Sequence, residues 1–345
     1  IVDAFSGTAI RILGPDSRAA RLESSKCFAK EFMRKHGVAT ASFASFSNLA
    51  DARLAAKRAG GKIVLKYDGL ASGKGVFVCN GISEAEQAFA SFAENFGEHT
   101  ACILEERLDG EEVSVIGITD GETIRLFLPA QDHKQLLDGD LGPNTGGMGA
   151  FCPVPFCDSV LMERIQRTII QPTLNGIQKE KMKYLGPIFF GIMLSRNWPK
   201  LLEYNVRSGD PETQVMMASL KSNLLPLILG CFDGTLSRVP VEFHSGSFVG
   251  VVLAGGNYPR KSFHSEVISG LELLKPDTLV FHSATKNVDG RFVTAGGRIM
   301  SVVSHGIDLT EAREKVYREC GKIRFPGIQY RHDIGNRKGT SGKQK

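Results

Sequence analysis

The sequence predicts an α/β (α+β) protein with a small inserted subdomain and a β-rich C-terminal domain. Apolar runs of strand length alternate with amphipathic helical runs before Gly234, as expected for packed layers of strands and helices. After Gly234 the pattern changes to the short strands FVGVVLA, LVFHSAT and RIMSVVS, with one helix near residues 310–320. The expected parts are the end of an earlier α/β domain (1–23), a main domain (24–61 with 129–234), a small α+β subdomain (62–128), a C-terminal domain (235–335) and a disordered tail (336–345).

The composition favours a soluble globular protein, for which we expect a cytoplasmic location. It contains 42% hydrophobic and 23% charged residues, and no apolar run is long enough for a membrane helix. The seven cysteines form no CxxC pair, so we expect reduced thiols of an intracellular protein. Four of the positive charges behind the net charge of +5 lie in the tail, at Arg337, Lys338, Lys343 and Lys345. This placement argues against nucleic acid as a partner.

Helix signals mark four segments of the chain. The run SSKCFAKEFMRKHG begins with serine and ends at Gly37. A capping box at 83–86 precedes a helix whose phenylalanines share one face and which ends at Gly97. Two further helices are expected over 158–180, interrupted near Pro172, and over 212–230.

A glycine-rich loop from Asp68 to Gly75 joins two predicted strands. Its spacing differs from a Walker A motif, and a strand on each side is the wrong context for one. Its glycines still allow backbone amides to close over phosphates, with Lys66 and Lys74 supplying positive charge. A plain flexible hairpin remains the alternative interpretation.

The segment 129–153 is polar and rich in glycine, and it is too long for an ordinary connection. Loops of this length within a compact domain are usually functional. We therefore expect it to contact a ligand, with no metal role for His133.

A predicted hairpin over 191–204 ends in several polar side chains. Because strand side chains alternate between faces, Glu203 and Asn205 lie on one face and Tyr204 on the other. A carboxylate and an amide oxygen suit Mg²⁺ that also binds phosphates. Arg207 shares this face if the strand continues. A solvated strand end with ordinary ion pairs is the alternative.

Seven segments in this order closely resemble phosphoribosylamine–glycine ligase, a family of the ATP-grasp superfamily. These segments are LESSKCFAKEFMRKHG, KYDGLASGKGV, ILEERLDGEEVS, PAQDHK, GPNTGGMGA, LLEYNVRSGDPET and AGGNYP. The resemblance implies an ATP-grasp fold in which 62–128 is the lid subdomain. It also implies that most of the family's N-terminal domain is absent, which agrees with a chain that begins at Ile1 inside a strand-like apolar run.

The family's activity is the ATP-dependent ligation of glycine to 5-phosphoribosylamine through a glycyl phosphate, in de novo purine biosynthesis. The products are glycinamide ribonucleotide, ADP and phosphate, and Mg²⁺ or Mn²⁺ is the expected metal. The chain could also belong to a longer multifunctional purine-synthesis protein. Phosphoryl transfer requires charge neutralisation and alignment, for which the chain offers lysines, a glycine-rich loop and oxygen ligands.

The resemblance also implies residue roles. Glu203 and Asn205 would bind the metal, and Arg207, Asp210 and Glu212 would line the pocket for the acyl phosphate and the amine. The implied nucleotide and substrate ligands are Lys26, Lys66, Gly73, Lys74 and Gly75 around the phosphates, Glu105, Glu106, Arg107 and Leu108 around adenine, Glu112 at the ribose, and Lys134 and Asn144 in the substrate-facing loop.

Two other functions remain open from the sequence. The chain could be an ATP-grasp carboxylate–amine ligase with a different amine acceptor. The segments 131–149 and 207–212 would decide between the two ligases, because the choice of acceptor should depend on them and not on the residues around adenine. It could also be a nucleotide-binding module that is inactive through loss of its N-terminal domain. Glycine-stimulated ATP hydrolysis would exclude the binding module.

Overall fold

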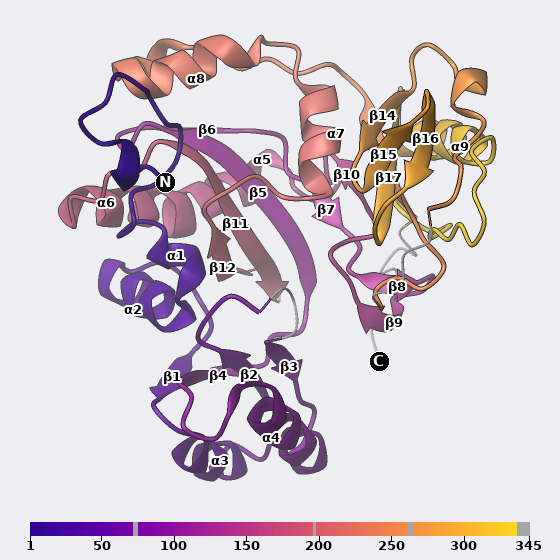
Figure 1. Cartoon of the computed structure of the whole chain (residues 1–345). Coiled ribbons are helices and arrows are strands. Elements are labelled where there is room, and N and C mark those ends of the chain that lie inside the picture. The colour runs from indigo at the N-terminus through magenta and orange to yellow at the C-terminus, as the bar shows by residue number, and fades with distance from the viewer. Residues whose placement is uncertain (72–74, 196–197, 261–264, 337–345) are drawn as a thin grey trace. The chain divides into compact units, whose positions relative to one another are not determined.

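The computed structural model describes residues 1–71, 75–195, 198–260 and 265–336. The chain forms two compact units, each of which combines distant parts of the sequence (Figure 1). Unit 1 comprises 1–127, 156–208 and 223–240, and unit 2 comprises 128–155, 209–222 and 241–345. Of the expected tail, 337–345 lies outside the described residues.

The first helices of unit 1 follow a segment without a strand. The expected strand-like run at Ile1 is wrong, because residues 3–5 form a 3-10 helix, η1. The helix expected at SSKCFAKEFMRKHG is confirmed as α2. Ser25 caps it by accepting a hydrogen bond from Phe28 N at 3.1 Å, and Gly37 ends it with φ 70°. The bounds are η1 Asp3–Phe5, α1 Arg21–Ser24 and α2 Lys26–His36.

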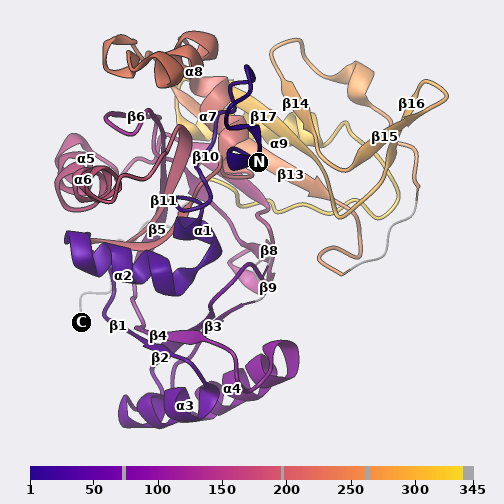
Figure 2. The same ribbon diagram turned by 60° about the vertical axis from the view of Figure 1, so that its left-hand side comes forward.

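A four-stranded antiparallel sheet with the order β1-β4-β2-β3 forms the small part of unit 1. Figures 1 and 2 both show α3 and α4 side by side on one side of this sheet. Phe89 and Phe92 of α4 pack with Leu49, Leu65 and other buried residues, which confirms the phenylalanine face as core. The bounds are β1 Phe43–Phe46, α3 Leu49–Arg58, β2 Ile63–Tyr67, β3 Val76–Val78, α4 Ile82–Phe96 and β4 Cys102–Glu106.

The capping box expected at Ser83 is wrong. The helix begins two residues earlier than that motif requires, with Gly81 as the N-cap and Ser83 inside α4. Glu84 accepts hydrogen bonds from Asn80 N at 2.9 Å and from the Asn80 amide at 2.7 Å. A carboxylate in the first turn therefore accepts hydrogen bonds from the N–H groups of the residue just before the helix.

A second antiparallel sheet has the order β12-β11-β5-β6. β5 pairs with β11 along its whole length, from Thr119 opposite Gly186 to Glu111 opposite Leu194. The segment 62–128 is thus divided between two sheets, because β5 finds its partner beyond it. The bounds are β5 Glu111–Thr119, β6 Ile124–Leu126, β11 Gly186–Ser195 and β12 Trp198–Asn205.

The expected hairpin is confirmed as β11 and β12, although Trp198 and Pro199 belong to the second strand and not to the turn. Asn197 lies outside the described residues.

The interrupted helix expected over 158–180 is also confirmed. Its middle is a π-helix, η2, that ends just before Pro172 at the start of α6, where the ring lacks the N–H needed for a regular turn. The bounds are α5 Ser159–Ile165, η2 Gln166–Ile170, α6 Gln171–Lys179, α8 Leu224–Asp233 and η3 Leu236–Arg238.

Unit 2 is built on a five-stranded sheet with the order β14-β17-β13-β10-β7. The C-terminal strands and helix expected after Gly234 are confirmed, and β7 and β10 join their sheet from the segment 129–153. Helices α7 and α9 pack on β13 and β17. The bounds are β7 Gln131–Asp132, β10 Gly149–Cys152, α7 Glu212–Ser219, β13 Ser247–Ala254, η4 Leu271–Leu273, β14 Leu279–His282, β17 Arg298–Gly306 and α9 Leu309–Cys320.

Two further parts of the chain differ from the sequence predictions. The segment 129–153 is not an open loop, since it also contains the hairpin of β8 (Gln135–Leu137) and β9 (Leu141–Asn144). The helix expected over 212–230 is two helices, α7 and α8. The amides of Lys221 and Ser222 donate to Glu242 O, and Asn223 caps α8, so the chain leaves the helix there. A further hairpin joins β15 (Thr285–Val288) to β16 (Arg291–Thr294).

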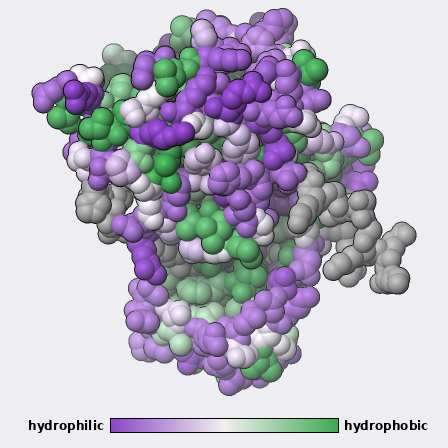
Figure 3. All heavy atoms as spheres, turned by 90° about the vertical axis from the view of Figure 1, so that its right-hand side faces the viewer, coloured by the Kyte–Doolittle hydropathy of each residue, from purple (hydrophilic) through white to green (hydrophobic). Residues whose placement is uncertain are grey.

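The surface is mainly polar on the face that Figure 3 displays, where hydrophilic residues predominate and hydrophobic ones form separate groups. Among the described residues, the helices are all too short or too polar to span a membrane.

Candidate functional site

A buried cluster of one carboxylate and two lysines lies where three elements of unit 1 meet. Glu105 on β4 is 2% exposed. Its Oε2 lies 2.8 Å from Lys30 Nζ on α2, and its Oε1 lies 2.8 Å from Lys66 Nζ on β2. The cluster carries one excess positive charge in a desolvated position, which favours a nearby anion.

Lys30 belongs to this cluster although the sequence did not mark it as a site residue. Burial lowers the pKa of Lys30 to about 8, while Glu105 opposes the shift. Its Nζ also donates to Thr40 Oγ1 at 2.7 Å. Lys30 is a lysine on the buried face of an amphipathic helix, one turn after Lys26, and that pattern was the available signal.

The start of the glycine-rich loop is held by the N-terminus of α2. Asp68 accepts hydrogen bonds from Ser25 Oγ and Cys27 N, both at 3.0 Å, and Lys26 Nζ donates to Gly69 O at 3.3 Å. Gly75 is buried, and a Cβ there would lie 2.7 Å from Ala71 Cβ. The predicted phosphate ligands Gly73 and Lys74 lie outside the described residues.

The segment expected to bind adenine continues from Glu105 with its side chains already engaged. Glu106 forms an ion pair with Lys200 and accepts from Ser42 Oγ at 2.8 Å. The hydrogen bond from Lys200 holds the pKa of Glu106 below its usual value. Arg107 pairs with Asp109 at 2.9 Å, and Leu108 is half-buried. The side chains of Glu106 and Arg107 are thus engaged with neighbouring residues of unit 1.

Glu112 lies near the start of β5, opposite Met193 of β11. It is half-buried, whereas its neighbour Glu111 is exposed. Strand β12, which carries Glu203 and Asn205, belongs to the same sheet as Glu112 and is separated from β5 by β11.

The end of β12 has the alternation that the sequence predicts. Tyr204 is buried, and its hydroxyl lies 2.7 Å from Thr173 Oγ1. Glu203 and Asn205, on the opposite face, are half-buried and pair with Gly191 and Phe189 of β11. A Cβ at Gly191 would lie 3.4 Å from Glu203 Cγ, an ordinary van der Waals distance, so a small side chain would fit there.

Arg207 is fixed beside this pair by Glu23, a residue that sequence reasoning missed. Arg207 Nη2 donates to Asn205 Oδ1 at 3.2 Å, and its Nε donates to Glu23 Oε1 at 3.1 Å. Glu23 Oε2 also accepts from Val206 N at 2.8 Å. Glu23 and Arg207 are 184 residues apart, so only the folded chain reveals the pair.

Glu203 and Asn205 fit a hard divalent cation. Both offer oxygen ligands from one strand face, and an amide oxygen that accepts one hydrogen bond keeps a second lone pair. Among the described residues, no three His, Cys, Asp or Glu side chains form a metal-binding group. A site of two protein ligands suits Mg²⁺ or Mn²⁺ that takes its other ligands from phosphates and water.

Asp210 and Glu212 belong to unit 2. Asp210 Oδ2 accepts from Arg298 Nη2 at 2.7 Å, and its Oδ1 accepts from Gln214 Nε2 at 3.0 Å. Glu212 is 4% exposed in the first turn of α7, where a carboxylate is stabilised by the helix dipole. Arg298 was not predicted, because an isolated arginine at the start of a strand carries no local signal.

Lys134 and Asn144 lie at the base of the β8–β9 hairpin, and both are exposed. Lys134 O accepts from Thr145 N at 2.7 Å, and Asn144 Oδ1 accepts from Gln135 Nε2 at 3.2 Å. The fold thus places these two predicted residues at the same end of one hairpin.

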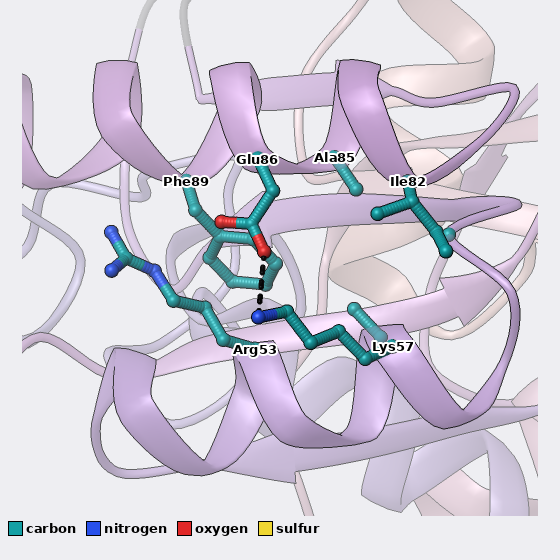
Figure 4. A pocket seen from close by; sticks show the side chains of 8 residues that line it. Arg53, Lys57, Ile82, Ala85, Glu86 and Phe89 are labelled. Atoms are coloured by element: carbon teal, nitrogen blue, oxygen red, sulfur yellow. Dashed lines mark ion pairs between the residues drawn. The ribbon is translucent and has the colours of Figure 1, made fainter.

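A depression on the small part of unit 1 is unrelated to these groups. It lies between α3 and α4, where Lys57 Nζ and Glu86 Oε1 form an ion pair at 3.1 Å (Figure 4). None of its lining residues is a predicted site residue, and we assign it no role in the chemistry.

Two family models match the chain: the phosphoribosylglycinamide synthetase ATP-grasp (A) domain over 24–213 and the C domain over 248–337. The chain is 42% identical to a phosphoribosylamine–glycine ligase of Ralstonia nicotianae, over 98% of this chain and 81% of that protein. It is 41% identical to the ligase of Clostridium acetobutylicum, over 98% of this chain and 82% of that protein.

Solved structures agree with this similarity. The phosphoribosylamine–glycine ligase of Thermotoga maritima matches with a TM-score of 0.86 and 34% identity, covering 96% of this chain and 83% of that one. The biotin carboxylase domain of Hydrogenobacter thermophilus 2-oxoglutarate carboxylase has a TM-score of 0.71 and 15% identity, covering 95% of this chain and 72% of that one; it shares the fold. The chain therefore belongs to the phosphoribosylamine–glycine ligase family and has the ATP-grasp fold.

Proposed function

We propose that this chain joins glycine to 5-phosphoribosylamine with ATP, forming glycinamide ribonucleotide, ADP and phosphate. The observation that carries the proposal is 42% identity to a phosphoribosylamine–glycine ligase over 98% of the chain.

The reaction proceeds in two displacements. A carboxylate oxygen of glycine attacks the γ-phosphorus of ATP, the bond from this phosphorus to the β–γ bridging oxygen breaks, and ADP leaves with the bonding pair. The amine nitrogen of 5-phosphoribosylamine then attacks the acyl carbon, phosphate leaves with the bonding pair of the C–O bond, and the nitrogen loses a proton. Both steps depend on aligned reactants and neutralised phosphate charge.

Unit 1 provides the groups for the nucleotide. Lys66 and Lys26 bind phosphate oxygens, and the loop that contains Gly73, Lys74 and Gly75 closes over them. Lys30 and Glu105 hold Lys66 in place, since Glu105 contacts both lysines at 2.8 Å. The main chain of 105–108 binds adenine, and Glu112 accepts hydrogen bonds from the ribose hydroxyls.

The remaining roles concern the metal and the second substrate. Glu203 and Asn205 hold Mg²⁺ or Mn²⁺, which supplies charge neutralisation at the phosphates when bound. Arg207, Asp210 and Glu212 serve the acyl phosphate and the amine, while Lys134 and Asn144 contact the substrate from the β8–β9 hairpin.

The test measures ADP formation with ATP and Mg²⁺ in the presence of glycine, 5-phosphoribosylamine, both or neither. We expect the full rate only with both, and weak ATP hydrolysis with glycine alone, because an acyl phosphate without its amine is lost to water. A protein that binds ATP but forms no ADP under any of these conditions would be a nucleotide-binding module. A higher kcat/KM with another amine would instead identify a different carboxylate–amine ligase.

A further inference from the structure

The β8–β9 hairpin forms a separate two-stranded sheet within unit 2. Leu137 and Leu141 lie opposite each other across it, and they are 51% and 63% exposed. A two-stranded hairpin without an apolar face against a core is marginally stable by itself. Because Leu137 and Leu141 pack little against the core, polar contacts are important for the orientation of the hairpin.

Those contacts come from the segment 331–333, at the far end of the sequence. Arg331 Nη1 donates to Asp140 Oδ1 at 2.8 Å and to Gln135 O at 3.2 Å. Asp333 Oδ2 accepts from Gly139 N at 2.8 Å, and His332 N donates to Asp138 Oδ1 at 2.7 Å. The segment thus binds the turn of the hairpin and the start of its first strand.

Arg331 is the central member of this contact. It is 1% exposed, and its Nε and Nη2 both lie 2.7 Å from the carboxylate oxygens of Asp333. Such a two-pronged arginine–carboxylate pair fixes geometry as well as charge. Burial alone would raise the pKa of Asp333, but the hydrogen bonds from Arg331 and Gly139 N hold that pKa at about 2.

The segment is itself fastened to the core of unit 2 by α9. Ile334 N donates to the hydroxyl of Tyr317 at 2.9 Å, and Arg313 Nε donates to Ile334 O at 2.9 Å. Tyr317 and Arg313 lie one turn apart on α9. A continuous set of hydrogen bonds therefore runs from α9 through 331–334 to the hairpin.

We propose that Arg331 is a positioning residue that holds the β8–β9 hairpin in the orientation needed to present Lys134 and Asn144 to the substrate. The link to substrate rests on the proposed function, whereas the link between Arg331 and the hairpin rests on the structure. Arg331 itself contacts no reacting group in this proposal; it acts through the hairpin.

The first measurement is amide hydrogen exchange of 135–144 without substrates, in the full chain. The variants are Arg331→Ala, Arg331→Lys and Asp140→Asn. Asp140 has φ 57°, a conformation that asparagine also adopts, so Asp140→Asn removes the charge without straining the turn. Asp289→Asn is the matched control, because Asp289 has φ 49° in the turn of the β15–β16 hairpin and forms no ion pair with the described residues.

We expect exchange in 135–144 to accelerate about tenfold or more in Arg331→Ala, which loses the hydrogen bonds to Asp140 and Gln135 O. Asp140→Asn should also accelerate exchange, because its neutral amide oxygen accepts a weaker hydrogen bond from Arg331 than the carboxylate does. Arg331→Lys should lie between them and the parent, because lysine keeps the charge but not the fork. Asp289→Asn should match the parent over 135–144. Parental exchange in Asp140→Asn would overturn the proposal, even if Arg331→Ala failed to fold.

The second measurement separates positioning from general stability. In Asp140→Asn, kcat/KM for glycine or 5-phosphoribosylamine should fall about tenfold, while ATP affinity by calorimetry stays at the parental value. Equal loss of ATP affinity and of turnover would indicate a structural role only and would overturn the proposal. If the parent chain showed no ligase activity, the proposed function would fail while hydrogen exchange still decided whether Arg331 holds the hairpin.

Discussion

Arg298 donates to the carboxylate of Asp210 across 2.7 Å, from a position 88 residues away in the sequence. The same guanidinium donates through Nη1 to Gly146 O at 2.7 Å and to Asp210 O at 3.2 Å. Gly147 completes the contact, because a Cβ at this position, with φ 110°, would lie 2.4 Å from Pro211 Cδ. One arginine thus joins two segments that the sequence marked independently as parts of the site.

This relationship predicts a catalytic effect of Arg298→Ala. Losing charged hydrogen bonds worth roughly 1.5–3 kcal/mol should lower kcat/KM about tenfold to a hundredfold. Arg298→Lys should recover part of the loss, because lysine keeps a positive charge beside the Asp210 carboxylate. Steady-state ADP release measures the effect, and Arg291→Ala, at an exposed position on β16, is the control. Parental kinetics in folded Arg298→Ala would exclude this role for the arginine.

Glu203→Ala should remove a metal ligand and abolish turnover while the fold persists, because Glu203 is half-buried at a strand end and packs little of the core. Turnover as a function of Mg²⁺ concentration, together with circular dichroism, provides the measurement. Glu94→Ala, on the exposed side of α4, should behave as the parent. Unchanged activity in a well-folded Glu203→Ala protein would remove Glu203 from the metal site.

Glu112→Ala should weaken ATP binding about tenfold to a hundredfold, because a charged hydrogen bond contributes roughly 1.5–3 kcal/mol. Calorimetric titration with a non-hydrolysable ATP analogue measures the affinity. Glu111→Ala is a close control, since Glu111 is the preceding residue on β5 and points to the opposite face. Equal affinities of the Glu112→Ala protein and the parent would show that Glu112 does not bind the ribose.

Glu180 should make part of the stability of unit 1 sensitive to acid. Hydrogen bonds from Lys35 at 2.7 Å and His36 at 2.9 Å lower the pKa of Glu180 from 4.5 to about 2. Because the folded-state pKa lies below the unfolded value, this stabilisation is complete above pH 4.5 and is lost as the pH falls toward 2. With Lys35 largely exposed, we expect a contribution of about 1–2 kcal/mol.

Urea unfolding of the parent and of Glu180→Gln at pH 7 and pH 3 tests this prediction. The difference in unfolding free energy between the two proteins should be larger at pH 7 than at pH 3. Glu31→Gln, which removes an exposed ion pair with Arg34 on α2, should show little difference at either pH. A constant difference between the parent and Glu180→Gln would contradict the assignment of the acid-sensitive stability to Glu180.

Local patterns predicted many elements of the fold. The serine and glycine ends of α2 and the alternation along β12 depend on neighbouring residues, so they are visible in the sequence. The single helix expected over 212–230 was wrong for the opposite reason, because Glu242 O, far along the chain, accepts the amides that break it. Strand β5 was expected in the small subdomain, but it pairs with β11, which follows about seventy residues later. Strand pairing is a non-local interaction, so local patterns do not reveal the partner.

The sequence by itself determined the family, the ATP-grasp fold and the face shared by Glu203 and Asn205, since motifs in order and a period of two need no tertiary contact. Only the tertiary structure decided which charges meet: Glu105 with Lys30 and Lys66, Arg207 with Glu23, Asp210 with Arg298, and Arg331 with Asp140. Burial decides the importance of such pairs, because a desolvated charge needs a partner whereas an exposed one does not. A linear sequence records neither that burial nor the partner, since both arise when strands and helices far apart in the chain pack together.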